Sequence, residues 1–167
     1  MTAPQATAAP GATTGEVARQ SSAAGQEVHS SGSEGVVQVT KRALIRNQQT
    51  QRCLASNAAG SPYTTPCNSA STYQQWRFEI SSNQRIWNVA TGRCLTYALA
   101  SGSATGAVST ASCNGSSAQV WLPHTTGALW TYIGGRCLDS NSQGTVYTLS
   151  CNGSGNQIWQ KIYFSTP

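Results

Sequence analysis

The stretches Cys53–Cys67 (CLASNAAGSPYTTPC) and Cys137–Cys151 (CLDSNSQGTVYTLSC) align from one cysteine to the next without a gap. A third stretch, Cys94–Cys113, is five residues longer. In all three stretches an Arg precedes the first cysteine, a Leu follows it, and an Asn follows the second cysteine. One segment therefore occurs three times in the chain, and we call these occurrences the first, second and third copies in chain order.

Each copy closes with Gln-x-Trp, at Gln74–Trp76, Gln119–Trp121 and Gln157–Trp159. The first cysteines of successive copies are 41 and 43 residues apart, so the copies fill the chain from about residue 42 to its end. A unit of this length cannot bury an apolar face alone, whereas three units around a common axis share one core. We predict that Trp76, Trp121 and Trp159 lie in that core, because each buries on the order of 200 Å².

The composition favours strands and turns over helices. Charged residues make up only 9% of the chain, whereas an ordinary globular domain has about a quarter. Ser, Thr, Asn, Gln and Gly are abundant instead. We therefore predict an all-β domain. Because no run approaches the roughly 18 to 20 apolar residues of a membrane helix, no membrane insertion is predicted.

Basic charge is concentrated in residues 42–167, where seven Arg and Lys161 oppose only Glu79 and Asp139, which leaves a net charge of +6. The arginines before the first cysteines cannot all be ion-paired, so we expect them to bond backbone carbonyls. Nucleic-acid binding requires clustered cations with accessible aromatic side chains. Because the repeat spreads these cations over the domain, we predict no nucleic-acid partner.

The six cysteines allow 15 pairings, and only one of these gives every copy the same local geometry. It joins Cys53 to Cys67, Cys94 to Cys113 and Cys137 to Cys151. A zinc site is the competing interpretation, but the chain has no Cys-x-x-Cys and neither histidine lies near a cysteine pair. We predict neither a metal nor another cofactor. Persistent disulfides imply an oxidising compartment, so we expect a secreted protein whose signal peptide, absent from the sequence, has been removed.

Residues 1–41 differ in composition from the rest of the chain. Residues 1–35 contain no aromatic side chain, and Val17 and Val28 are their only branched aliphatic residues. Such a segment buries too little apolar surface to offset the entropy of ordering it. We predict an extended or disordered tail over 1–41, either a spacer or a segment that docks on a protein partner, followed by a domain over 42–167. The valines at 36, 37 and 39 leave open an edge strand at the end of the tail.

The three copies of Arg-Cys-Leu, Cys-Asn and Gln-x-Trp resemble the ricin B-type lectin repeat, as found in secreted bacterial proteins. The resemblance covers about residues 42 to 165 and implies a β-trefoil of three units of roughly 42 residues with pseudo-threefold symmetry. β-Trefoils also serve as protease inhibitors and growth factors, so the fold alone does not decide the function. The three Gln-x-Trp motifs favour the lectin class.

The resemblance implies a sugar pocket only in the third copy. The family places an Asp two residues after the first cysteine, where this chain has Ala55, Thr96 and Asp139. It places an Asn before the Gln of Gln-x-Trp, where this chain has Tyr73, Ala118 and Asn156, followed in the third copy by Gln157.

The family's aromatic platform, two residues before the second cysteine, is absent at Thr65, Ala111 and Leu149. Tyr147, two residues earlier on the same strand face as Leu149, is the candidate for a displaced platform. The alternative for Asp139 is a turn cap that accepts backbone N–H groups around Ser140 and Asn141.

Two functions remain open. The first is a secreted, non-enzymatic, carbohydrate-binding module with at most one weak sugar pocket, formed by Asp139, Tyr147, Asn156 and Gln157. The second is an adaptor that joins protein partners through residues 1–41 and a degenerate trefoil, like lectin-like subunits of some secreted toxin complexes. Catalysis is not predicted, because hydrolysis by paired carboxylates needs a second acid beside Asp139 and the domain offers only Glu79.

Overall fold

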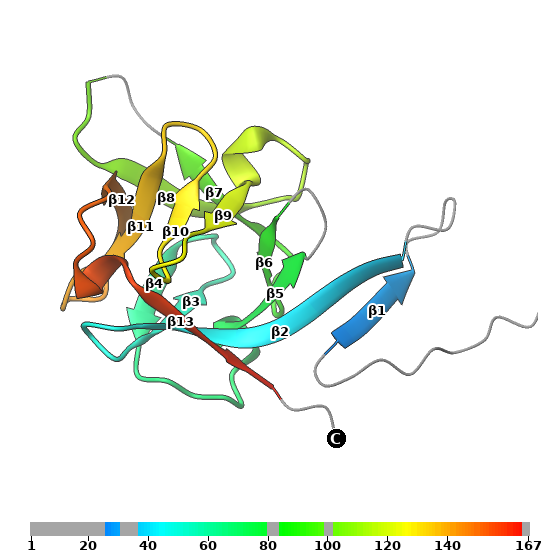
Figure 1. Ribbon diagram of the computed structural model, residues 1–167. Coiled ribbons are helices and arrows are strands. Elements are labelled where there is room, and N and C mark those ends of the chain that lie inside the picture. The colour runs from blue at the N-terminus through cyan, green and yellow to red at the C-terminus, as the bar shows by residue number, and fades with distance from the viewer. Residues whose placement is uncertain (1–25, 31–36, 80–83, 99–101, 165–167) are drawn as a thin grey trace, which may run out of the picture.

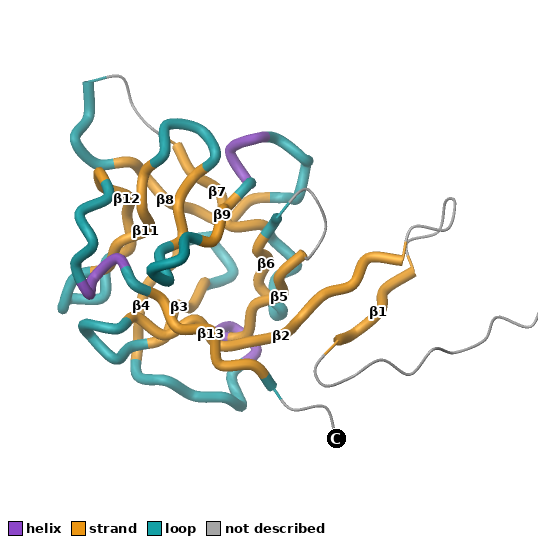
Figure 2. The backbone as a smooth tube through the Cα atoms, in the orientation of Figure 1, coloured by secondary structure: helices purple, strands orange, loops and turns teal. Residues whose placement is uncertain are grey.

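The computed structural model describes residues 26–30, 37–79, 84–98 and 102–164. Within these ranges the chain forms strands and three single-turn 3-10 helices, η1 (Thr72–Gln74), η2 (Ser117–Gln119) and η3 (Gly155–Gln157), and no α-helix. Each 3-10 helix directly precedes the Trp-bearing end of a copy. Figure 2 shows the strands wound into one compact body with long connecting loops.

Each copy supplies four strands. The first copy contains β2 (Val37–Asn47), β3 (Cys53–Ser56), β4 (Pro62–Thr65) and β5 (Gln75–Glu79). The second contains β6 (Ile86–Asn88), β7 (Cys94–Ala98), β8 (Gly106–Ala111) and β9 (Trp121–Pro123). The third contains β10 (Leu129–Thr131), β11 (Arg136–Ser140), β12 (Val146–Ser150) and β13 (Trp159–Tyr163).

The outer strands of the copies close into a six-stranded barrel. Antiparallel ladders join β2 to β5, β5 to β6, β9 to β10 and β13 to β2. The bridge of Arg85 with Val120 joins the β6 and β9 sides within the second copy, and that of Ala128 with Ile158 joins the β10 and β13 sides within the third, which completes the ring. The inner strands form three hairpins, β3–β4, β7–β8 and β11–β12, at one end of the barrel. This arrangement is a β-trefoil, and it confirms the predicted fold class.

The three hairpins meet around the pseudo-threefold axis through backbone contacts. The N–H of Thr64 donates to Gly144 O and the N–H of Thr110 donates to Gly60 O, both at 2.8 Å. A Cβ atom at Gly60 or Gly144 would lie 2.6 Å from the facing threonine carbonyl oxygen, and both glycines have positive φ. Glycine is therefore required where the copies touch.

The core lies between the barrel and the hairpins. Trp76, Trp121 and Trp159 are each at most 2% exposed and belong to one apolar cluster. Each indole N–H donates to the carbonyl of the Leu after the first cysteine of its own copy, at 2.8 to 2.9 Å. The indole rings thus combine apolar burial with a satisfied polar edge, which a buried Trp needs.

The cysteines form the three bridges that the repeat predicts, Cys53–Cys67, Cys94–Cys113 and Cys137–Cys151. The arginine before each first cysteine donates to a backbone carbonyl: Arg52 to Thr64, Arg93 to Ala58 and Arg136 to Ala104. Each bridge closes the base of one inner hairpin, Arg52 bonds a strand of its own hairpin, and Arg93 and Arg136 bond loops of the preceding copy.

Part of the segment predicted as a tail is paired. Strand β1 (Gln26–Ser30) lies antiparallel to Val37–Lys41 of β2, and Figure 1 shows this hairpin extending away from the barrel. The boundary predicted after residue 41 therefore falls inside β2. Residues 1–25 and 31–36 lie outside the described part of the chain, and the division into tail and domain stays a prediction.

Candidate functional site

Asp139 and Tyr147 face each other on neighbouring strands of the third copy, in the register of β11 and β12. Asp139 is 2% exposed, whereas Tyr147 is half-buried. The pKa of the Tyr147 phenol is raised, first by burial, then by the negative charge of Asp139 and by the hydrogen bond between the two side chains. The structure thus joins a buried carboxylate and an aromatic ring that the sequence placed eight residues apart.

The Asp139 carboxylate is only partly satisfied. Its Oδ1 is buried and has no hydrogen-bond partner among the described residues. The turn after β11 is instead capped by Asn141, whose Oδ1 accepts the N–H of Thr145 at 2.9 Å. Asn57 caps the equivalent turn of the first copy in the same way, with Ser61 as donor. The turn therefore does not depend on Asp139.

Gln157 is fully buried and its amide is committed to the backbone. Its Nε2 donates to Ser150 O at 3.1 Å, and its Oε1 accepts the N–H of Asn152 at 2.8 Å. Gln74 and Gln119 make the corresponding pairs of bonds in the other copies. Gln157 thus fixes the chain on both sides of Cys151.

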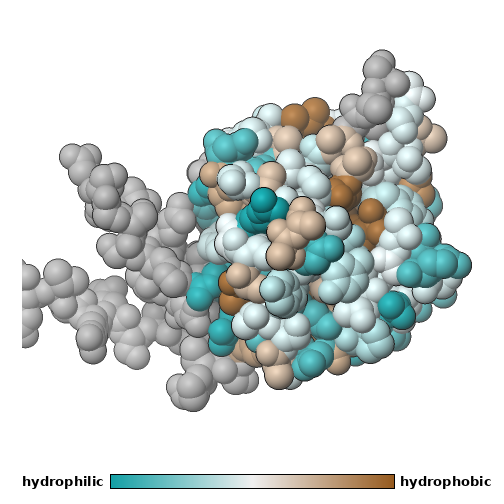
Figure 3. Space-filling model, turned by 180° about the vertical axis from the view of Figure 1, so that it is seen from behind, coloured by the Kyte–Doolittle hydropathy of each residue, from teal (hydrophilic) through white to brown (hydrophobic). Residues whose placement is uncertain are grey.

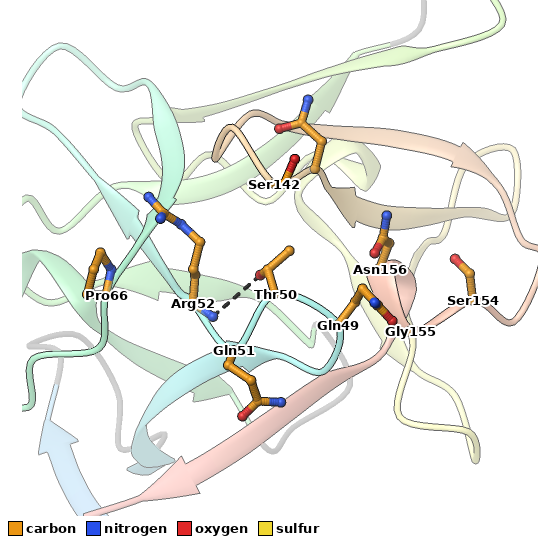
Figure 4. A pocket seen from close by; sticks show the side chains of 10 residues that line it. Gln49, Thr50, Gln51, Arg52, Pro66, Ser142, Ser154, Gly155 and Asn156 are labelled. Atoms are coloured by element: carbon orange, nitrogen blue, oxygen red, sulfur yellow. Dashed lines mark hydrogen bonds between the residues drawn. The ribbon is translucent and has the colours of Figure 1, made fainter.

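Asn156 lies in η3, which packs against β11. Its side chain lines a groove of about 950 Å³ between the first and third copies. Figure 4 shows residues 49–52 of the first copy on one side of this groove, and Ser142 and Asn156 of the third copy on the other. The loop of the first copy is held in place because Gln49 N donates to Gly155 O at 3.1 Å and Asn47 Nδ2 donates to Asn156 O at 2.7 Å.

Sequence reasoning missed the first-copy side of this groove. Residues 49–52 and Asn156 are about a hundred positions apart, and only the closure of the trefoil brings them together. Residues 49–52 contain amide, hydroxyl and guanidinium groups of the kind found over the whole chain, so their pattern carries no sign of a site.

The other two copies lack the pairing of acid and tyrosine. Ala55 faces Tyr63 in the first copy and Thr96 faces Ser109 in the second. Ala55 is fully buried, and Thr96 Oγ1 accepts Gln119 Nε2 at 3.2 Å. Asp139 is therefore the one carboxylate at this position in the threefold set.

The site offers hydrogen-bond acceptors and an aromatic ring but no obvious metal centre. Among the described residues, no cluster of three or more His, Cys, Asp or Glu side chains is arranged to hold a metal ion. The other carboxylate of the domain, Glu79, accepts a hydrogen bond from Arg85 Nε at 2.8 Å at the barrel, on β5. In the described ranges, no helix is both long and apolar enough to cross a membrane.

The sequence model of the ricin-type beta-trefoil lectin domain matches residues 12–121 and 82–164 of the chain. The chain belongs to this family, a class of carbohydrate-binding domain. No match was found among curated protein sequences.

Solved structures share the fold at low sequence identity. A designed threefold-symmetric protein, ThreeFoil, superposes with a TM-score of 0.63 at 21% identity, over 72% of this chain and 97% of that one. A non-toxic homologue of type II RIPs from Momordica charantia (bitter gourd), in complex with alpha-methyl-D-galactoside, gives 0.64 at 19% identity, over 74% and 48%. An agglutinin from Abrus precatorius gives 0.62 at 20% identity, over 72% and 46%. The chain thus spans less than half the length of these two plant proteins.

Proposed function

We propose that this protein is a secreted, non-enzymatic, carbohydrate-binding module whose charged sugar site, built on Asp139, lies in the third copy. The observation that carries the proposal is the buried Asp139 carboxylate with one oxygen that lacks a partner. An unsatisfied buried acceptor costs free energy, and more when it is charged. A sugar hydroxyl that donates to Oδ1 recovers this cost, which makes the carboxylate an anchor for the ligand.

The surroundings of Asp139 supply the other contacts that a sugar needs. Tyr147 covers the carboxylate and turns aside on binding, so that its ring stacks against the C–H face of the sugar. Asn156 belongs to η3, which packs against β11, and its position at the groove between the copies lets a longer glycan reach its amide; Gln157 holds η3 in place through its backbone bonds. The bitter gourd protein carries a galactoside on the same fold, which supports this class of ligand.

Asp139 acts as a binding group rather than as a catalytic acid. Paired-carboxylate hydrolysis places the two acids within about 10 Å across the scissile bond. The second carboxylate of the domain, Glu79, belongs to a barrel strand of the first copy and is paired with Arg85. The three disulfides support residence in an oxidising compartment.

Replacing Asp139 by Asn tests the proposal. The amide keeps the volume of the side chain but removes the charged acceptor, so glycan affinity is expected to fall by about 10- to 100-fold. The free energy of unfolding is expected to stay the same or to rise, because a buried and partly unpaired charge is removed. Glycan-array binding and titration calorimetry with the best glycan measure the affinity, and thermal unfolding measures the stability.

Thr96→Ala is the matched control, because Thr96 holds the same position in the second copy. It is expected to leave glycan binding unchanged. Unaltered affinity in Asp139→Asn, or a large loss of stability without loss of affinity, would show that Asp139 serves the fold and not the sugar.

A second function is favoured by the β1–β2 hairpin. Among the described strands β1 pairs with β2 alone, so its other edge offers free backbone groups. A protein partner that adds a strand to this edge would make the chain an adaptor, with the trefoil as its second contact. Deletion of residues 1–35 removes β1, and unchanged recovery of secreted partners in a pull-down would count against this function.

A further inference from the structure

Two tryptophans outside the Gln-x-Trp motifs occupy the same position in two copies. Trp87 on β6 pairs with Cys94, and Trp130 on β10 pairs with Cys137. Both side chains are half-buried, unlike the tryptophans of the core. In the first copy the equivalent partner of Cys53 is Arg46.

Each of these tryptophans forms a wall of a cavity against the disulfide of its own copy. The Trp87 cavity, of about 230 Å³, is also lined by Arg85, Gly92 and the Cys94–Cys113 bridge. The Trp130 cavity, of about 150 Å³, is also lined by His124, Ile158 and the Cys137–Cys151 bridge. The same three features, an indole ring and the two cysteines of the copy, therefore enclose both cavities.

The Trp130 ring is oriented with its polar edge inward. Its Nε1 is buried and has no acceptor among the described residues, so packing alone positions the ring. His124 meets the ring edge to face, with centroids 5.3 Å apart and planes at 78°. His124 Nδ1 is bonded to Thr126 Oγ1 at 2.9 Å, which fixes the imidazole and leaves its Nε2 for another partner.

In the first copy, the residue that pairs with the first cysteine is not aromatic. Arg46 takes the place of the tryptophan, and its Nε and Nη2 donate to Gln160 Oε1 at 3.2 and 2.6 Å. Its polar group is satisfied within the protein. The aromatic ring in the other two copies is therefore not a requirement of the trefoil.

We propose that Trp87 and Trp130 are the platforms of two further sugar-binding sites, separate from Asp139. A pyranose ring stacks its C–H face on the indole, and its hydroxyls bond His124 Nε2 in the third copy and the Arg85 guanidinium in the second. The cavities of about 230 and 150 Å³ lie beside the two indole rings, where one face of a pyranose can enter while its remaining hydroxyls stay in solvent. These rings supply an aromatic surface in the second and third copies, where Ala111 and Leu149 lack one.

The test follows the indole N–H signals of the full chain by ¹H–¹⁵N NMR during titration with methyl pyranosides of galactose, glucose and mannose. Signals of Trp87 and Trp130 are expected to shift with at least one pyranoside, at a millimolar dissociation constant, while those of Trp76, Trp121 and Trp159 stay in place. The shifts are expected to persist in Asp139→Asn, so failure of this inference is distinguishable from failure of the site at Asp139.

Trp130→Arg installs the residue of the first copy and is expected to abolish only the third-copy site, whereas Tyr132→Ala, at an exposed neighbouring ring, is expected to have no effect. Unchanged core indole signals show that a variant is folded, and Trp130→Phe, with weaker binding expected, replaces Trp130→Arg if that variant does not fold. Absence of shifts at Trp87 and Trp130 with all three pyranosides would overturn the proposal. Phenol is titrated in parallel as a mimic of an aromatic side chain. Shifts with phenol but with none of the pyranosides would overturn the proposal as well, because they would indicate sites for aromatic peptide side chains.

Discussion

The pKa of the Tyr147 phenol responds to Asp139, its neighbour across the strand pair. The pKa of Tyr147 lies above its ordinary value of 10.0 because of burial, the Asp139 charge and a hydrogen bond to that carboxylate. The folded protein therefore keeps the phenol proton to a higher pH than the unfolded chain. The stability that results is complete below the unfolded pKa of about 10 and is lost as the pH rises through the folded pKa.

We predict that Asp139→Asn lowers the pKa of Tyr147 toward its ordinary value, because the negative charge disappears and a neutral amide oxygen is a weaker hydrogen-bond acceptor. Burial remains, so part of the elevation is expected to remain. NMR titration of the Tyr147 ring signals between about pH 8 and 12 measures the change, with exposed Tyr132 as the internal reference. An unchanged Tyr147 pKa in the variant would mean that the two side chains are not in contact.

For single residues, the sequence predicted which side chains belong to the candidate site, but not how deeply they are buried or what they bond. The offset from the first cysteine singles out Asp139, and the tyrosine two residues before Leu149 proves to be its cross-strand neighbour. The Asp139 carboxylate is almost fully buried because other side chains pack around it. The spacing of residues in the sequence does not reveal this burial. The backbone bonds of Gln157 are likewise visible only in three dimensions.

At the scale of elements, the close approach of the hairpins predicts which glycines are irreplaceable. Gly60→Ala would place a methyl group 2.6 Å from Thr110 O, whereas Gly115→Ala meets nothing within 4 Å, and both glycines have positive φ. The left-handed conformation costs either alanine about 1–2 kcal/mol. The clash is expected to destabilise Gly60→Ala by a further ~1–3 kcal/mol. Chemical denaturation of the two variants measures the difference, and equal losses would contradict this packing of the hairpins.

One element-level departure from threefold symmetry was not predicted. Ser56 bonds Thr110 and Ser140 bonds Thr64 through their hydroxyls at 3.0 Å, but the second copy has Tyr97 where the others have Ser. As a result Thr148 Oγ1 is buried without a partner among the described residues. The sequence shows the substitution plainly, but its consequence requires knowing that hydroxyls of different copies meet.

For the whole molecule, the repeat predicted three units around a common axis, the disulfides and the carbonyl bonds of the arginines, and the resemblance to the ricin B-type repeat identified this arrangement as a β-trefoil. The groove between copies and the partner strand β1 depend on contacts outside the repeating unit, so the sequence indicated only a strand around Val37 and Val39, which is the start of β2. On the face seen in Figure 3 apolar residues form small separate groups among polar ones. Such a surface suits a hydrated ligand such as a glycan better than a large apolar partner.

The most direct test of the account maps the sugar onto the whole domain. Backbone ¹H–¹⁵N signals are recorded while the wild-type chain is titrated with the glycan that it binds best on an array. We predict that the signals of Asp139, Tyr147 and Asn156 shift together and saturate at one dissociation constant, while their counterparts in the first and second copies stay in place. Equal shifts at Ala55 and Thr96, or no shift around Asp139 at saturation, would contradict a sugar site built on the carboxylate of the third copy.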